Sequence, residues 1–188
     1  MEPLATLPVE TARTAFEQRE KPMKTLHDVY HLQLQDAHSA CKQALAATTE
    51  LGRAAQDKDL SEALIAGANG ITDGMDKLKS LCAEHDLDPN GHHCGGMEGL
   101  VKEAREHAIK DEFDNPDARD AMIIAQYQRM AHYAIAAYGT LRAYANRLGL
   151  DGDGAMLGQM LDTAYDGDRT MTDLATGKDG INAEATAA

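Results

Sequence analysis

The densest group of side chains that could bind a metal ion lies between residues 82 and 94. Thiol and imidazole groups are the usual ligands of zinc, and this stretch contains Cys82, His85, His92, His93 and Cys94. The first two are about one helical turn apart, and the others lie in the glycine-flanked segment DPNGHHCGG. This spacing is not that of a zinc finger or ribbon. Zinc binding therefore stays open beside the alternative that these are ordinary solvated side chains.

Two other features could carry chemistry. Cys41 precedes Lys42, and a neighbouring cation can lower the pKa of a thiol, but a cysteine in the middle of a core helix is more often inert. The turn DGDG at 151–154 resembles the start of a calcium loop. It has Ala155 at the fifth position and Asp162 in place of the glutamate expected at the twelfth, so we discount it. No catalytic Ser/His/Asp array or phosphate-binding loop is found.

These residues must be positioned by helices, of which the clearest runs from residue 116 to 148. Asn115-Pro116 is typical of a helix start, because the asparagine can cap it and proline is tolerated at the first position. Gly149 predicts its end. Apolar residues recur between them at steps of three and four, and the middle is rich in alanine. A helix of this length usually crosses a bundle from end to end.

Similar patterns predict helices over residues 26–55, 60–87, 97–110 and 155–176. The first begins at Thr25, with Asp28 completing a capping box. The chain is therefore expected to be all-α, a four-helix bundle with a short extra helix between helices two and three. Residues 1–22 are expected to be an N-terminal extension, 23–176 the bundle, and 177–188 a flexible tail.

The composition narrows the classes of function. The net charge is −13 and the pI is near 4.9, which argues against binding nucleic acid or an anionic membrane surface. No apolar run is long enough to span a bilayer, and the N-terminus has no signal-peptide pattern. The three cysteines show no disulfide spacing, which favours free thiols in a reducing compartment. We expect a cytoplasmic protein.

Several motifs resemble those of one family. They include MKTL at 23–26, C-x-x-MEGL at 94–100, His132-Tyr133 and YGTL at 138–141. With these motifs the chain from residue 23 to about 175 resembles the YciE/YciF family of bacterial stress proteins, which is ferritin-like. The resemblance implies a ferritin-like bundle, a role in stress physiology and a homodimer.

The resemblance also implies a dinuclear iron or manganese centre, which needs carboxylates from all four helices. Carried over residue by residue, nearly all the ligand positions have lost them. Only Asp168 remains acidic, and His132 has lost the acid on either side of it. The other ligand positions are occupied by Cys41, Asn69, Gly70, Gly74, Ala131, Ala134 and Ala164. We therefore expect no cofactor and no functional dinuclear centre.

Small residues at these positions have two possible consequences. The helices could close together, with methionines filling the gaps. Alternatively, the bundle keeps its spacing and a pocket opens for a small organic ligand, with His38 and Asp168 as polar groups. The expected lining of that pocket is Cys41, Gly70, Gly74, Met130, Ala131, Ala134, Ala164 and Asp168.

The sequence thus favours a stress-associated protein that acts by binding or by structure and is not an enzyme. The alternative is a metal-dependent oxidase or peroxide scavenger of the ferritin-like type that uses ligands outside the family pattern. Metal analysis of the purified protein separates the two.

Overall fold

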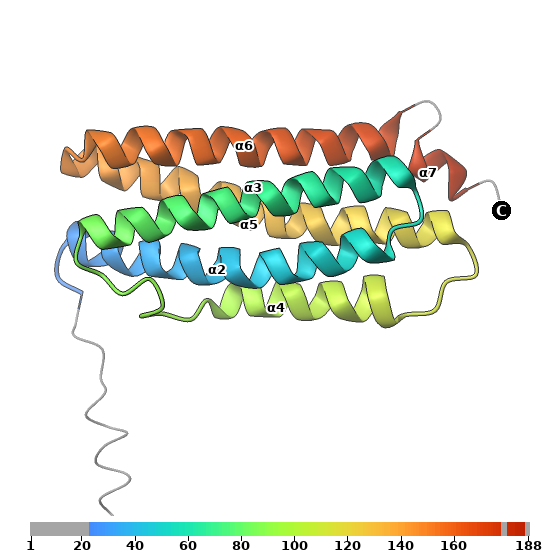
Figure 1. The fold of residues 1–188 in the computed structure, drawn as a ribbon, viewed down its shortest axis with the longest axis horizontal. Coiled ribbons are helices and arrows are strands. Elements are labelled where there is room, and N and C mark those ends of the chain that lie inside the picture. Colours follow the sequence, from blue (N-terminus) through green and yellow to red (C-terminus); the bar gives the residue numbers. More distant parts are fainter. Residues whose placement is uncertain (1–22, 178–179, 187–188) are drawn as a thin grey trace, which may run out of the picture.

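The computed structural model describes residues 23–177 and 180–186 and confirms an all-α, ferritin-like bundle (Figure 1). Residues 1–22, expected to be an extension, lie outside the described residues. Four long helices form the bundle, and a shorter one packs against it between the second and third. Their bounds are α2 (Leu26–Ala54), α3 (Lys58–Glu84), α4 (Gly95–Ala104), the π-helix η1 (Arg105–Lys110), α5 (Pro116–Leu148), α6 (Asp151–Thr176) and α7 (Ile181–Glu184).

The predicted ends of α2 and α5 are confirmed by their capping interactions. The Thr25 side chain accepts a hydrogen bond from the Asp28 amide, and the Asp28 carboxylate accepts one from the Thr25 amide, which makes a capping box. The side-chain oxygen of Asn115 accepts from the amides of the first turn of α5. At the other end of α5, Gly149 has φ of +75°, a conformation that glycine adopts without strain.

One buried carboxylate fixes the turn between α2 and α3. Asp120 of α5 is fully buried and accepts hydrogen bonds from the backbone amides of Gln56 and Asp57, the shortest at 2.6 Å. Asp57 in turn caps α3 by accepting from the Leu60 amide. A side chain from the third long helix therefore holds the connection between the first two.

At the opposite end of the bundle, a second buried acid joins three elements. The Tyr30 hydroxyl donates to Asp153 at the start of α6 over 2.7 Å, and the His85 ring is also 2.7 Å from this carboxylate. These contacts, with those of Asp120, set the directions of the helices. The start of α2 meets the end of α3, the end of α5 and the start of α6, so α2 and α6 run parallel and α3 and α5 run the other way.

The short extra helix differs in detail from the single helix expected over 97–110. Six of its residues form π-helical turns, in which the Asp111 amide bonds to Glu106, five residues earlier. Arg105 anchors this part by donating two hydrogen bonds to Glu50 of α2, at 2.7 and 2.8 Å. Apolar spacing cannot distinguish the two helix types over so few residues, because both bury Ala104 and Ala108.

Part of the segment 177–188, which was expected to be a flexible tail, is helical in the structure. Within its described part, α7 packs against α5 and α6, and Ile181 is only 6% exposed. The Asn115 amide also donates to the Ala185 carbonyl over 3.3 Å. A single apolar residue in a polar stretch gives no periodic signal, yet it can cover the end of a bundle.

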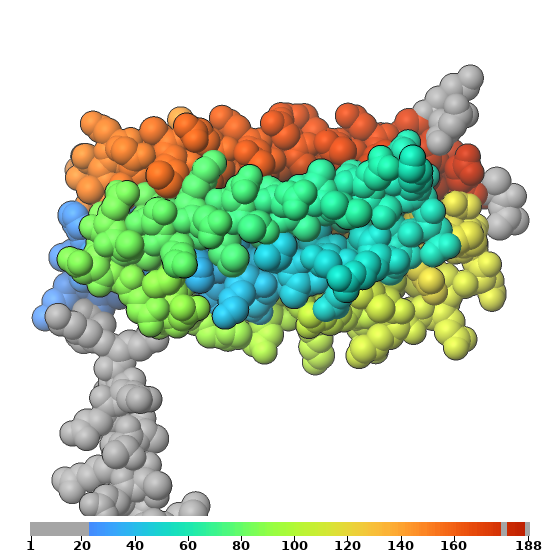
Figure 2. Space-filling model, in the orientation of Figure 1, coloured from blue at the N-terminus to red at the C-terminus, as the bar shows by residue number. Residues whose placement is uncertain are grey.

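Figure 2 shows α6 and α3 side by side across one face of the molecule. In the described parts of the chain, no helix has the length and apolar character needed to cross a membrane.

Candidate ligand cavity

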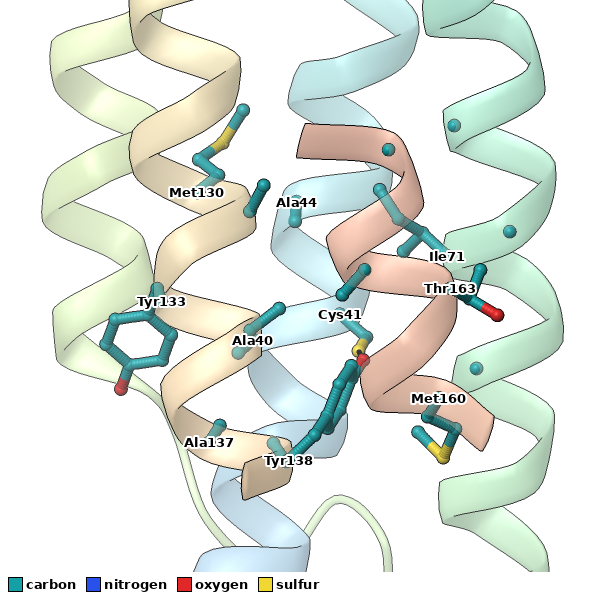
Figure 3. A pocket seen from close by; sticks show the side chains of 18 of the residues that line it. Ala40, Cys41, Ala44, Ile71, Met130, Tyr133, Ala137, Tyr138, Met160 and Thr163 are labelled. Carbon is teal, nitrogen blue, oxygen red and sulfur yellow. Dashed lines mark hydrogen bonds between the residues drawn. The ribbon is translucent and has the colours of Figure 1, made fainter. Parts of the chain in front are cut away.

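A cavity of about 150 Å³ lies in the middle of the bundle, where the buried side chains divide into two clusters. One cluster surrounds Leu51 and Met97, and the other surrounds Tyr30 and Leu157. The cavity touches both, and its wall is mostly alanine, glycine, methionine and tyrosine, nearly all from α2, α3, α5 and α6 (Figure 3).

All the expected lining residues except Asp168 do lie on this wall. They come from all four long helices. These residues are Cys41, Gly70, Gly74, Met130, Ala131, Ala134 and Ala164. The centre is partly filled, as one of the two expected outcomes allowed: Met130, Met160 and the tyrosines Tyr127 and Tyr138 occupy part of it, and a cavity remains between them. Whether the cavity holds a ligand stays a prediction.

Asp168 was placed wrongly, since it does not line the cavity. Its carboxylate accepts from Gln128 at 3.0 Å and lies 3.1 Å from the ring of His132, which is itself exposed. The face of α6 that points inward passes through Ala164 and Gly167. Asp168 follows Gly167 by one residue and is therefore turned about 100° away. His38 is also absent from this wall and lines a separate surface groove beside Pro89.

Tyrosine side chains of α5 hold the centre open. The Tyr127 hydroxyl lies between two glycines, because a Cβ atom would be 2.8 Å from it at Gly67 and 3.2 Å from it at Gly167. Tyr138 reaches across to Cys41 of α2 in the same way (Figure 3). A phenol ring fits beside a glycine but not beside a larger residue. Gly67 of α3 and Gly167 of α6 therefore leave room for the Tyr127 ring, a role that the sequence pattern did not reveal.

The thiols near the cavity are paired with tyrosines and are not reactive. The Cys41 sulfur is 2.9 Å from the Tyr138 oxygen, and burial raises the pKa of Cys41 to about 11. Burial also raises the pKa of Cys94, whose sulfur is 2.9 Å from the Tyr133 oxygen. Because the thiolate is the nucleophile, burial disfavours the reactive form of both cysteines. The cavity thus has no nucleophile of this kind.

The lining does not fit a dinuclear metal centre. Iron and manganese need several anionic oxygens, and the one acidic residue of the wall is Asp73, which is exposed. Among residues 23–177 and 180–186, no group of three or more His, Cys, Asp or Glu side chains is arranged to hold a metal ion. The wall is mainly apolar and lacks the set of carboxylates that such a centre requires.

The five candidate zinc ligands are not brought together either. Each has a different neighbour. Cys82 is fully buried, His85 contacts Asp153, His92 contacts Asp36, His93 contacts Glu98, and Cys94 caps α4 through its sulfur.

One polar atom of the cavity wall has no partner. Thr48 is 1% exposed, and its hydroxyl oxygen is buried without a hydrogen bond. A buried, unpaired hydroxyl costs about 1–3 kcal/mol. Sequence reasoning missed this residue, because a threonine on the apolar face of a helix is usually bonded to its own backbone.

We expect Thr48→Val to stabilise the ligand-free protein by about 1 kcal/mol, because valine has nearly the same shape without the unpaired hydroxyl. Urea denaturation of both proteins measures this. Thr49→Val is the matched control, since the Thr49 hydroxyl donates to the Leu45 carbonyl over 2.8 Å and its removal should bring no gain. A loss of stability in Thr48→Val would contradict the assignment.

Together, the fold and cavity define a ferritin-like four-helix bundle whose central positions are apolar. Residues 25–186 match the domain of unknown function DUF892. Protein YciF of Escherichia coli K12 is 34% identical over 154 residues, which are 81% of this chain and 92% of YciF. The chain therefore belongs to the DUF892 family and is of the YciE/YciF type.

Solved structures agree with this assignment. The crystal structure of the E. coli stress protein YciF superposes with a TM-score of 0.76 at 35% identity, covering 81% of this chain and 95% of the other. YcfI of Rhodopseudomonas palustris superposes with a TM-score of 0.78 at 28% identity, covering 84% and 99%.

Proposed function

We propose that this protein is a stress-associated, ferritin-like binding protein that works without a dinuclear metal centre and holds a small, largely apolar molecule in its central cavity. The association with stress rests on YciF, which is described as a stress protein. The observation that carries the proposal is the cavity itself, at the positions where the family resemblance implies metal ligands, with small apolar residues in their place.

The size of the cavity makes binding energetically reasonable. At about 24 cal/mol per Å³, an enclosed and empty apolar cavity of 150 Å³ would cost roughly 3–4 kcal/mol, which is an upper bound here because the exposed residues Asp73 and Thr163 on the wall open the cavity to solvent. An engineered cavity of about this volume in another protein stays dry and binds benzene or xenon. A void this costly is expected either to be filled by an occupant or to be retained because an occupant uses it.

Benzene is a suitable first probe, and thermal unfolding is the measurement. At a benzene concentration about tenfold above Kd, binding should add about 1.4 kcal/mol and raise Tm by roughly 3–5 °C. Ala134→Leu should abolish the shift by filling the cavity. Ala136→Leu is the control, because Ala136 lies on the exposed side of the same helix and should leave the shift unchanged. Equal shifts in the two variants would show that benzene binds elsewhere.

Metal analysis tests the other half of the proposal. After incubation with Fe²⁺ or Mn²⁺ and removal of excess ion, the protein should retain far less than one ion per chain. A stable content of about two ions per chain would overturn the proposal and support the alternative, a metal-dependent oxidase or peroxide scavenger with ligands outside the family pattern.

A further inference from the structure

We infer that the molecule bound in the cavity is a small, neutral ketone or aldehyde, and that the Tyr127 hydroxyl donates a hydrogen bond to its carbonyl oxygen. This inference rests on the proposed function and adds both the class of ligand and the residue that recognises it. Three observations carry it. The Tyr127 hydroxyl is unpaired, it lies at the cavity wall beside two glycines, and its surroundings favour a neutral acceptor.

Tyr127 differs from the other tyrosines of the wall because its hydroxyl has no partner. The Tyr133 oxygen is 2.9 Å from the Cys94 sulfur, and the Tyr138 oxygen is 2.9 Å from the Cys41 sulfur. The described residues offer no such partner to the Tyr127 hydroxyl, although the side chain is only 7% exposed. A buried donor without a partner raises the free energy of the folded state, and an acceptor on a ligand would relieve this cost.

A ligand in the cavity can reach the Tyr127 hydroxyl, in contrast to that of Thr48. The Thr48 oxygen is completely buried, whereas the Tyr127 oxygen is not among the enclosed, unpaired atoms and keeps some accessible surface. Added Cβ atoms at Gly67 and Gly167 would lie 2.8 and 3.2 Å from the Tyr127 oxygen, and both glycines line the cavity. The oxygen therefore lies at the wall, in the gap that the two glycines leave between α3 and α6.

The charges around Tyr127 favour a neutral ligand. Burial raises the pKa of Tyr127, and the negative charge of Asp168 raises it further, so the phenol keeps its proton and acts as a donor. The same charge disfavours an anionic ligand at this position. Lys77, the cationic residue of the wall, lies ten positions after Gly67 on α3, which is about 15 Å, and Asp73 is one turn from it. It therefore does not offset Asp168 at Tyr127.

Among neutral acceptors, a carbonyl group matches this site better than a hydroxyl group. A carbonyl oxygen only accepts, so one hydrogen bond from Tyr127 satisfies both partners. A ligand hydroxyl brings a second proton, and one of the two protons would stay unpaired whichever group donates. The other hydroxyls of the wall are enclosed or already paired: Thr48, Tyr133, Tyr138 and Thr163. A ketone or aldehyde leaves no proton without a partner.

Acetophenone, racemic 1-phenylethanol and ethylbenzene test the inference, because they share one carbon skeleton and differ only at the oxygen. Isothermal titration calorimetry on the full chain gives the Kd of each. Acetophenone should bind about fivefold more tightly than 1-phenylethanol, since the alcohol leaves one proton unpaired in a buried site. Ethylbenzene leaves water more readily than either compound, so it serves as the reference ligand when variants are compared.

The variant Tyr127→Phe assigns the preference to its residue. It should weaken the binding of acetophenone about three- to tenfold, which is the usual range for one hydrogen bond, and should leave the affinity for ethylbenzene nearly unchanged. The variant should fold, because the missing hydroxyl has no partner in the protein, and circular dichroism checks this. Tyr144→Phe is the matched control. Tyr144 is half-buried in the same helix and lies outside the lining, so the three affinities should stay as they are.

Infrared spectroscopy reports on the hydrogen bond itself. With acetophenone isotopically labelled at the carbonyl carbon, the carbonyl stretch of the bound ligand should lie at lower frequency in the wild-type protein than in Tyr127→Phe, because a donated hydrogen bond weakens the C=O bond. In Tyr144→Phe the band should stay at the wild-type frequency. A purely structural role of Tyr127 would change affinities without this difference between the variants.

The outcomes distinguish this inference from the proposed function. If Tyr127→Phe changes the affinities for acetophenone and ethylbenzene equally, and the carbonyl band does not move, the hydrogen bond from Tyr127 is overturned while cavity binding stands. If 1-phenylethanol binds as tightly as acetophenone, the assignment of a carbonyl group is overturned. If neither these three compounds nor benzene binds, the proposed function itself fails.

Discussion

Asp120→Ala is expected to lower the free energy of unfolding by about 3 kcal/mol, which corresponds to a fall in Tm of roughly 6–12 °C. Asp120 is fully buried, and its carboxylate accepts hydrogen bonds from the backbone amides of Gln56 and Asp57. Alanine would leave both amides without this partner and would empty the volume of the side chain. Urea denaturation followed by circular dichroism gives the difference.

The size of this effect depends on where the carboxylate acts. The turn between α2 and α3 spans only residues 55–57, and Asp57 also caps α3 through the Leu60 amide. Loss of the hydrogen bonds to Asp120 of α5 therefore destabilises the end of α2 and the start of α3 at once. Asp120→Asn should lose less, because the amide oxygen can still accept one of the hydrogen bonds.

Asp117→Ala is the matched control for Asp120. Asp117 lies one turn earlier in α5 and is half-buried, and it contributes mainly by its charge near the helix N-terminus, worth about 0.3–1 kcal/mol. If Asp120→Ala costs no more than Asp117→Ala, the backbone hydrogen bonds of Asp120 are not what holds the α2–α3 turn.

The role of Asp120 shows where prediction from sequence ends. The starts of α2 and α5 and the end of α5 were predicted because their signals are local: Thr25 with Asp28, Asn115 with Pro116, and Gly149. A buried acid inside α5 gives no local signal, since its partners are more than 60 residues away in the chain. Only the packing of the four helices brings them together.

Only part of the cavity lining could be predicted from the sequence. The small residues could be placed opposite one another because the family resemblance supplied the helix register, and all of those residues except Asp168 line the cavity. The resemblance could not show that Thr48 has an unpaired hydroxyl or that Tyr127 occupies the space beside two glycines. These facts depend on distances between side chains of different helices. The spacing of residues within one helix gives no information about such distances.

Gly67→Ala and Gly70→Ala are expected to change stability in opposite directions, by a difference of about 2 kcal/mol. A methyl group at Gly67 would lie 2.8 Å from the Tyr127 hydroxyl, and overpacking of this kind costs about 1–3 kcal/mol. A methyl group at Gly70 would meet only Thr163, at an ordinary 3.6 Å, so Gly70→Ala should gain up to about 1 kcal/mol from helix propensity alone. Parallel urea denaturation measures both.

The variant Tyr127→Phe tests whether the Tyr127 hydroxyl causes the loss of stability expected in Gly67→Ala. The Tyr127 hydroxyl also lies close to Gly167 of α6, where an added Cβ atom would be 3.2 Å from it, so the backbone of Gly167 is near the ring on its other side. Removing the hydroxyl should therefore restore most of the stability lost in Gly67→Ala, while the same change should leave Gly70→Ala unaffected. If Tyr127→Phe fails to rescue Gly67→Ala, the ring is not the spacer between α3 and α6, and another contact must keep the cavity open.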